Sequence, residues 1–137
     1  MEWREILSSR ALDRFRPVLI GIEGALLAVA LLFWVSTAFD VDSFSPETWG
    51  AWACQFPARY WAAVQCISAA MIVTGLMRPV THFRVAIGAG IQAAQFAALA
   101  YSATFTGGQF VIGVYPSVLF VPFHLILMVE ALRHERG

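Results

Sequence analysis

The sequence predicts an all-α integral membrane protein, a bundle of four transmembrane helices with both termini in the cytoplasm. Of its 137 residues, 59% are hydrophobic and only 13% are charged. A soluble domain carries about 25% charged residues, and half that density cannot cover a surface that faces water. Four long apolar runs each approach the ~20 residues that cross ~30 Å of hydrocarbon. Because these runs are continuous rather than alternating, they predict helices and not barrel strands.

The predicted spans cover residues 17–39, 58–77, 83–105 and 111–132. Their connections contain no repeat, no low-complexity tract and no linker rich in proline or serine. We therefore expect residues 1–137 to form a single membrane domain.

The positions of the arginines orient the four spans. With this span count, only Arg59 falls on the outer side. The other eight basic residues fall on the inner side: Arg4, Arg10, Arg14, Arg16, Arg78, Arg84, Arg133 and Arg136. The positive-inside rule then places both termini in the cytoplasm, and we expect the membrane to be a bacterial inner membrane.

An amphipathic segment precedes the first span. Apolar residues recur there at helical spacing, with charged residues between them: Trp3, Ile6, Leu7, Ala11 and Phe15. This pattern predicts a helix that lies on the inner leaflet, and the alternative is a solvated tail.

The long outer loop, residues 40–57, contains a second helical signal. Ser45 can cap a short helix, and Pro46 suits its first position. One face of that helix would then carry Trp49, Trp52, Ala53 and Phe56. Such a face predicts a helix that lies flat in the membrane interface.

The third span is rich in small residues. They are Ala86, Gly88, Ala89, Gly90, Ala93, Ala94, Ala97 and Ala98. Small side chains let helix backbones approach closely, and this contact drives helix association in lipid. We expect this helix to be central in the bundle or to lie at an interface with other membrane subunits or with copies of the chain.

Polar residues inside the spans are the candidate site. Counted from the span ends at 1.5 Å per residue, Glu23 lies roughly 9 Å deep and His124 roughly 12 Å deep. Gln92 lies at roughly 12 Å, Gln95 about one turn deeper, and Gln65 at roughly 20 Å. One polar side chain from each of three helices, Glu23, Gln92 and His124, thus falls at a similar depth in the inner half.

A carboxylate in hydrocarbon must find a partner, take up a proton or face water. His124 is the expected partner of Glu23, and Arg84 and Arg16 are alternatives. The pair could line a pathway or ligand pocket, or it could form a buried clasp between the first and fourth helices. In a third interpretation, Glu23 faces another subunit.

Other chemistries find no support in the residue pattern. No Ser/His/Asp or Cys/His spacing indicates nucleophilic catalysis. No Cys/His cluster indicates a metal site, and a single intramembrane histidine cannot supply two axial haem ligands. The net charge is zero, so nucleic acid is not an expected partner. We expect no cofactor, and we expect the chain to lie in a lipid bilayer.

One stretch resembles a known family. Residues 65–78 read QCISAAMIVTGLMR. This resembles the second-helix pattern of DoxX-like small four-helix membrane proteins, in which an acidic residue precedes a run of small residues and a Gly-x-x-Arg end. Gly75-Leu76-Met77-Arg78 matches that end, whereas Gln65 replaces the acid. The resemblance implies a four-span accessory component of a membrane redox system.

Together these observations predict a non-enzymatic membrane accessory, anchoring or assembly subunit of a larger complex. The first alternative is a small transporter or channel that works through Glu23 and His124. The second is a phage-type, holin-like protein whose helices assemble to permeabilise the bilayer.

Overall fold

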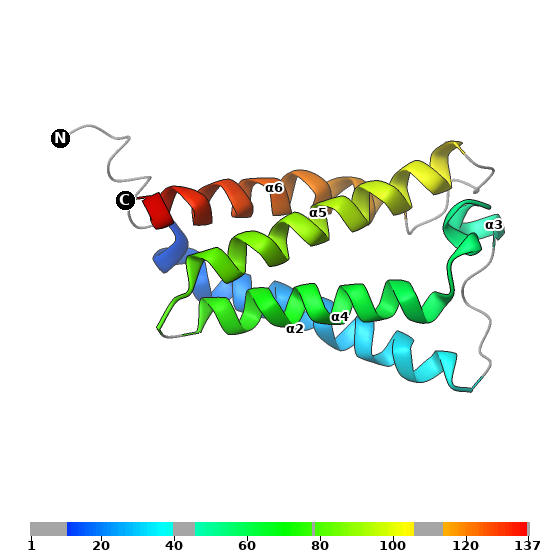
Figure 1. The fold of residues 1–137 in the computed structure, drawn as a ribbon, viewed down its shortest axis with the longest axis horizontal. Coiled ribbons are helices and arrows are strands. Elements are labelled where there is room, and N and C mark those ends of the chain that lie inside the picture. The colour runs from blue at the N-terminus through cyan, green and yellow to red at the C-terminus, as the bar shows by residue number, and fades with distance from the viewer. Residues whose placement is uncertain (1–10, 40–45, 78, 106–113, 137) are drawn as a thin grey trace.

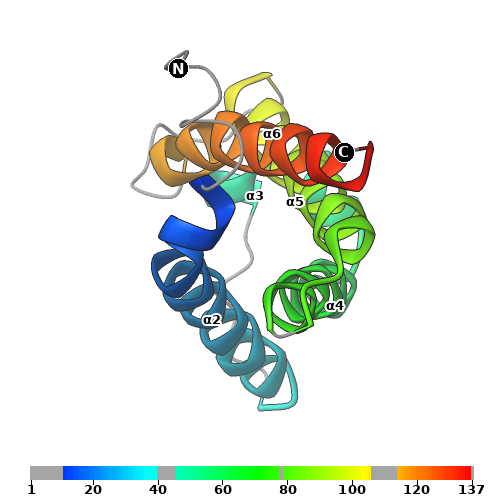
Figure 2. The same ribbon diagram turned by 90° about the vertical axis from the view of Figure 1, so that its left-hand side faces the viewer.

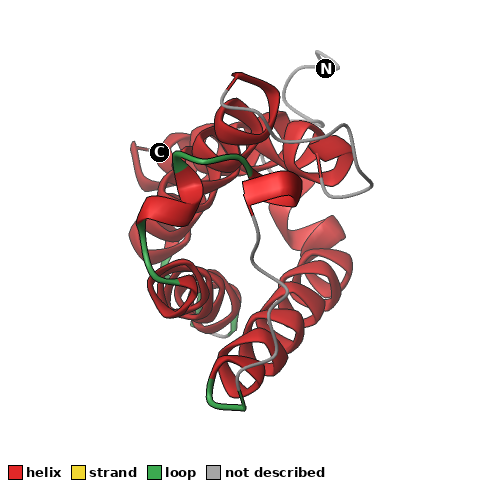
Figure 3. Ribbon diagram, turned by 90° about the vertical axis from the view of Figure 1, so that its right-hand side faces the viewer, coloured by secondary structure: helices red, strands yellow, loops and turns green. Residues whose placement is uncertain are grey.

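The computed structural model describes residues 11–39, 46–77, 79–105 and 114–136. All regular structure in these residues is helical (Figure 3). In chain order it comprises α2 (Ala11–Thr37), α3 (Pro46–Trp49), the 3₁₀ turn η1 (Ala53–Gln55), α4 (Ala58–Leu76), α5 (His82–Phe105) and α6 (Val114–Arg136). Most of the predicted amphipathic N-terminal segment, with Trp3, Ile6 and Leu7, lies outside the described residues.

Three of these helices are long and apolar enough to cross a membrane. They are α2, α5 and α6, which correspond to the first, third and fourth predicted spans. The predicted second span forms a helix of 19 residues, α4, but it is not among the three. The polar side chains of Arg59, Gln65 and Thr74 lower its apolar character.

The four long helices run alongside one another (Figure 1). α5 packs against both α4 and α6, and α2 packs mainly against α4. Seen end-on, α2, α4, α5 and α6 follow one another around the molecule (Figure 2). The start of α2, the α4–α5 connection and the end of α6 lie at one end, and α3 lies at the opposite end (Figure 1).

Two apolar clusters hold the helices together, one near each end. The first joins all four long helices through Leu12, Ile72, Leu76, Val85, Ala86, Ala89, Leu127 and Ala131. The second consists of Ala53, Trp61 and Leu99, with Trp49, Trp52 and Ala98 packed against them. The space between the two clusters contains the polar side chains of the candidate site.

Four of the eight small residues named on α5 are buried inside the chain, whereas Ala94 and Ala97 are exposed. A Cβ atom added to Gly88 would lie 2.8 Å from the Ser68 carbonyl oxygen and 2.8 Å from Ile72 Cγ1 on α4. At this position only glycine permits the two backbones to approach so closely. Small residues have the same role at other contacts between membrane helices. Ala86, Ala89 and Ala93 are buried as well. The close packing of α5 is therefore satisfied largely by α4 and α6.

The segment before α4 forms a short helix where one is predicted, but the helix ends early. α3 stops at Trp49 because Gly50 adopts a positive φ of 85°, which an L side chain rarely adopts. The backbone N–H of Ala53 donates to Ser102 Oγ at 2.8 Å, and Trp61 Nε1 donates to the Ala53 carbonyl at 2.9 Å. Trp49, Trp52, Ala53 and Phe56 thus do not form one continuous helical face, and the loop packs onto α4 and α5.

Candidate functional site

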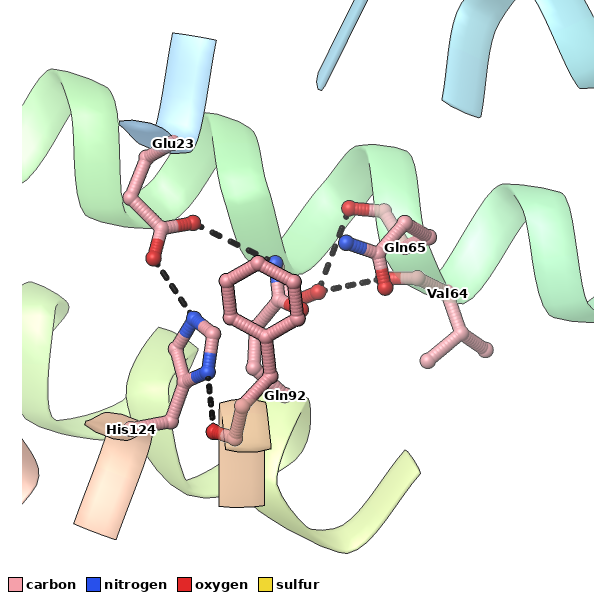
Figure 4. Close-up of polar contacts among 7 residues, drawn as sticks. Glu23, Val64, Gln65, Gln92 and His124 are labelled. Atoms are coloured by element: carbon pink, nitrogen blue, oxygen red, sulfur yellow. Dashed lines mark hydrogen bonds and ion pairs between the residues drawn. The ribbon is translucent and has the colours of Figure 1, made fainter. Parts of the chain in front are cut away.

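An acid and an imidazole meet in the interior of the protein. Glu23 on α2 and His124 on α6 are 101 residues apart, and Glu23 Oε1 lies 2.6 Å from His124 Nε2 (Figure 4). Both side chains are 0% exposed. Glu23 therefore meets His124 rather than Arg84, whose Nη1 lies 3.5 Å from Thr74 Oγ1 on the surface.

The second ring nitrogen of His124 determines where the protons are. Nδ1 lies 2.7 Å from the carbonyl oxygen of Phe120, one helical turn earlier. A carbonyl oxygen only accepts, so Nδ1 carries a proton and donates it. Nε2 of a neutral ring is then an acceptor, as is an ionised carboxylate, and two acceptors cannot lie 2.6 Å apart without a proton between them. Glu23 and His124 thus share one further proton, as neutral acid and imidazole or as carboxylate and imidazolium.

A glutamine donates a hydrogen bond to the other oxygen of the Glu23 carboxyl group. Gln92 Nε2 on α5 donates to Glu23 Oε2 at 3.4 Å (Figure 4). Gln92 is fully buried, and its own Oε1 has no hydrogen-bond partner. The amide therefore provides a long, weak bond to Glu23, and three helices converge on one carboxyl group.

Aromatic rings enclose the imidazole. The Phe96 ring stacks on His124 with 5.6 Å between centroids and 23° between planes. Phe123 meets it edge to face at 4.9 Å, and the Phe120 ring lies 5.9 Å away. This apolar shell lowers the local dielectric, so the hydrogen bond to Glu23 is electrostatically stronger than it would be in water.

Gln65 and Gln95 do not join this cluster. Gln95 Nε2 donates instead to the Trp61 carbonyl oxygen on α4, at 2.9 Å. No hydrogen bond links the Gln65 amide group to Glu23, Gln92 or His124. The five polar residues named from the sequence therefore separate into two groups, a triad of Glu23, Gln92 and His124 and a glutamine pair of Gln65 and Gln95.

Two pockets lie on either side of the triad along α2. The inner pocket, about 440 Å³, opens between α2 and α6 and is lined by Leu12, Phe15, Val18, Leu19, Ile22, Phe123, Ile126, Leu127 and Glu130. The outer pocket, about 330 Å³, lies between α2 and the α4–α5 pair and is lined by Leu26, Val29, Ala30, Phe33, Trp49, Trp61, Ala62, Gln65, Gln95, Phe96 and Leu99. Glu23 and His124 line neither of them.

Sequence reasoning missed the partners that complete the triad. The Phe120 carbonyl lies four residues before His124, and that spacing is itself a signal, because a helical side chain reaches the preceding turn. The stacking of Phe96 on His124 depends on the packing of α5 against α6, which no local pattern in the sequence encodes.

The described residues contain no group of three or more His, Cys, Asp and Glu side chains that could hold a metal ion. Comparisons with protein-family models, with curated proteins and with solved structures found no match for the chain. The resemblance of residues 65–78 to DoxX-like proteins therefore stays a prediction.

Proposed function

We propose that the chain is a four-span, non-enzymatic membrane protein that acts as an accessory or assembly subunit, with both termini in the cytoplasm. Three helices that are long and apolar enough to cross a membrane support the membrane setting. The packing of α4 against both α2 and α5 supports a fourth span, because α4 then runs beside two of these three helices. Its 19 residues measure about 28 Å, close to the hydrocarbon thickness.

The observation that best supports the subunit role is that the Glu23–His124 pair is fully buried and fully hydrogen-bonded. Both side chains are fully buried, each polar atom of the pair has a partner, and neither residue lines the inner or the outer pocket. A buried, hydrogen-bonded pair of this kind can fix which helices meet. A transport site would place at least one of these groups on a water-accessible path. The arrangement therefore favours a clasp between α2 and α6.

The large exposed apolar surface of α2 supports the presence of a partner helix. Only 11% of its apolar stretch is buried inside the chain, against 50% for α5 and 22% for α6. Gly21 and Ala25, one turn apart, are both exposed on its outer face. Because small residues permit close helix contact, this face suits a helix of another subunit or of a second copy.

One substitution tests this role directly. A Cβ added to Gly21 meets no atom within 4 Å, so Gly21→Leu should fold normally. If α2 docks on a partner, this variant should lose the cross-linked complex that the wild-type chain forms in native membranes. Ala97→Leu, an equivalent change on the exposed face of α5, is the matched control and should retain the complex. Equal recovery of the complex from both variants would argue against docking through α2.

Reporter fusions test the span count. Four spans place both termini on one side, whereas three spans place them on opposite sides. A reporter enzyme that is active only in the cytoplasm should therefore work when fused before residue 1 and also when fused after residue 137. Activity at only one of the two ends would overturn the four-span arrangement.

A specific observation favours transport as the second candidate. One proton is shared between Glu23 and His124, and pockets lie on both sides of this pair along α2. A proton relay would use such a layer. Proteoliposomes that contain the full chain should then show proton flux that Glu23→Gln abolishes while the variant still folds. A subunit role predicts no flux from either protein, and a holin-like role predicts cell killing with release of cytosolic proteins.

A further inference from the structure

The outer pocket combines an apolar wall with two glutamine side chains, Gln65 and Gln95. Four helices contribute to it, α2, α3, α4 and α5, and two of its lining residues are tryptophans, Trp49 and Trp61. Its volume of about 330 Å³ is at the lower end of the ~300–1,000 Å³ typical of ligand pockets. No charged residue lines it, so a charged ligand head would enter without a counterion.

Each of the two glutamines has one buried amide atom without a hydrogen-bond partner. Gln95 is 6% exposed, and its Oε1 is buried without a hydrogen-bond partner. Its amide orientation is fixed, because Nε2 donates to the Trp61 carbonyl and Oε1 must then point elsewhere. Gln65 Nε2 is likewise buried without a partner. Two residues that line the pocket therefore carry one unused acceptor, on α5, and one unused donor, on α4.

Such atoms indicate the chemistry of a ligand. Buried polar groups in proteins are nearly always hydrogen-bonded, so an unused donor and an unused acceptor at one pocket call for a complementary group. A hydroxyl group is the smallest group that both donates and accepts. A ketone or ester oxygen only accepts, and would leave Gln95 Oε1 without a partner.

We propose that the outer pocket binds a small, uncharged amphiphile that enters from the bilayer with its hydroxyl group towards Gln65 and Gln95. The hydroxyl donates to Gln95 Oε1 and accepts from Gln65 Nε2. The apolar body lies against α2 side chains and the two tryptophans. This site goes beyond the subunit role, and loss of partner docking through Gly21 would leave it intact.

A matched pair of probes tests recognition of the hydroxyl group. Bromododecanol and bromododecane differ by one hydroxyl, and their bromine atoms quench tryptophan fluorescence. In nanodiscs with the full chain, bromododecanol should quench saturably at a concentration about tenfold lower than bromododecane, since two hydrogen bonds at the low end of the usual net contribution together correspond to about tenfold. Equal quenching by the two probes would overturn the proposal and indicate general uptake of acyl chains.

Gln65→Leu connects that preference to the pocket. Gln65 Nε2 has no bond to lose, so the variant should fold, and thermal unfolding can verify this. Its preference for bromododecanol over bromododecane should fall about threefold, because one of the two hydrogen bonds to the hydroxyl is lost and the bond to Gln95 remains. Gln55→Leu, the same change at an exposed residue that does not line the pocket, should keep the wild-type preference. If both variants keep the preference, the assignment of this pocket is wrong.

Discussion

The triad and the glutamine pair occupy neighbouring positions in the same interior, yet they use their polar atoms differently. In the triad, both carboxyl oxygens of Glu23 and both ring nitrogens of His124 have partners within the protein. In the glutamine pair, Gln95 Oε1 and Gln65 Nε2 have none, and both residues line a pocket.

This difference indicates that buried polar groups with partners and buried polar groups without partners have different roles in the protein. Polar groups that satisfy one another fix how helices pack, and their loss should lower stability. Polar groups left without partners add little to packing, and their loss should change what the pocket accepts. The free energy of unfolding of a variant at each position tests this division.

His124→Leu should have the largest effect on stability. It leaves the Glu23 carboxyl buried without its imidazole partner, and breaking a buried pair costs about 3–5 kcal/mol. The value should lie at the lower end of this range, because Glu23 can take up a proton and become neutral. The free energy of unfolding, measured by denaturant titration in mixed micelles, reports this loss.

The double variant Glu23→Leu/His124→Leu is the control for this result. It removes both members of the pair, and replacement of a buried ion pair by apolar residues is often neutral. We expect it to recover most of the stability lost in His124→Leu. If the two variants are equally unstable, the loss comes from cavity formation around the ring rather than from an unpaired acid.

Gln95→Leu should have the second largest effect. Gln95 Nε2 makes a hydrogen bond of 2.9 Å with the Trp61 carbonyl, which joins α5 to α4. Loss of one such bond should lower the free energy of unfolding by about 1 kcal/mol. The same titration measures it, and a loss as large as that of His124→Leu would contradict the division between the two groups.

Gln92→Leu should cost less, about 0.5 kcal/mol, because its bond to Glu23 Oε2 is long at 3.4 Å. The substitution also removes the unpartnered Oε1, which offsets part of the loss. In the Glu23→Leu/His124→Leu background this cost should disappear, since the acceptor is gone. An undiminished cost there would show that Gln92 acts through packing and not through Glu23.

Most of the helices and part of the site could be predicted from the sequence. Apolar run length located α2, α5 and α6, since the length of a membrane helix follows from bilayer thickness. Depth counting grouped Glu23, Gln92 and His124, because rise per residue is constant along a helix. Depth alone does not give the direction in which a side chain points around the helix axis.

Because this direction is missing, the sequence alone places Gln65 and Gln95 in the same candidate site as Glu23, Gln92 and His124, although at greater depth. Gln95 follows Gln92 by three residues, and both are on the buried side of α5, yet one reaches α2 and the other reaches α4. Which neighbour each meets depends on the crossing of α2, α4 and α5. Local periodicity does not determine this crossing. The turn at Gly50 is also absent from the local pattern, because it depends on how residues 46–57 pack onto α4 and α5.

Gln65→Leu should have the smallest effect on stability, and it tests the comparison most sharply. The Gln65 amide nitrogen makes no hydrogen bond that the substitution could remove, and leucine has a similar volume. We expect the free energy of unfolding to stay constant or to rise by up to about 0.5 kcal/mol, because a buried donor without a partner is unfavourable. A loss of stability as large as that of Gln95→Leu would show that Gln65 supports the packing, and the glutamine pair would then resemble the triad. Constant stability together with a changed probe preference would mark Gln65 as a residue that serves the pocket.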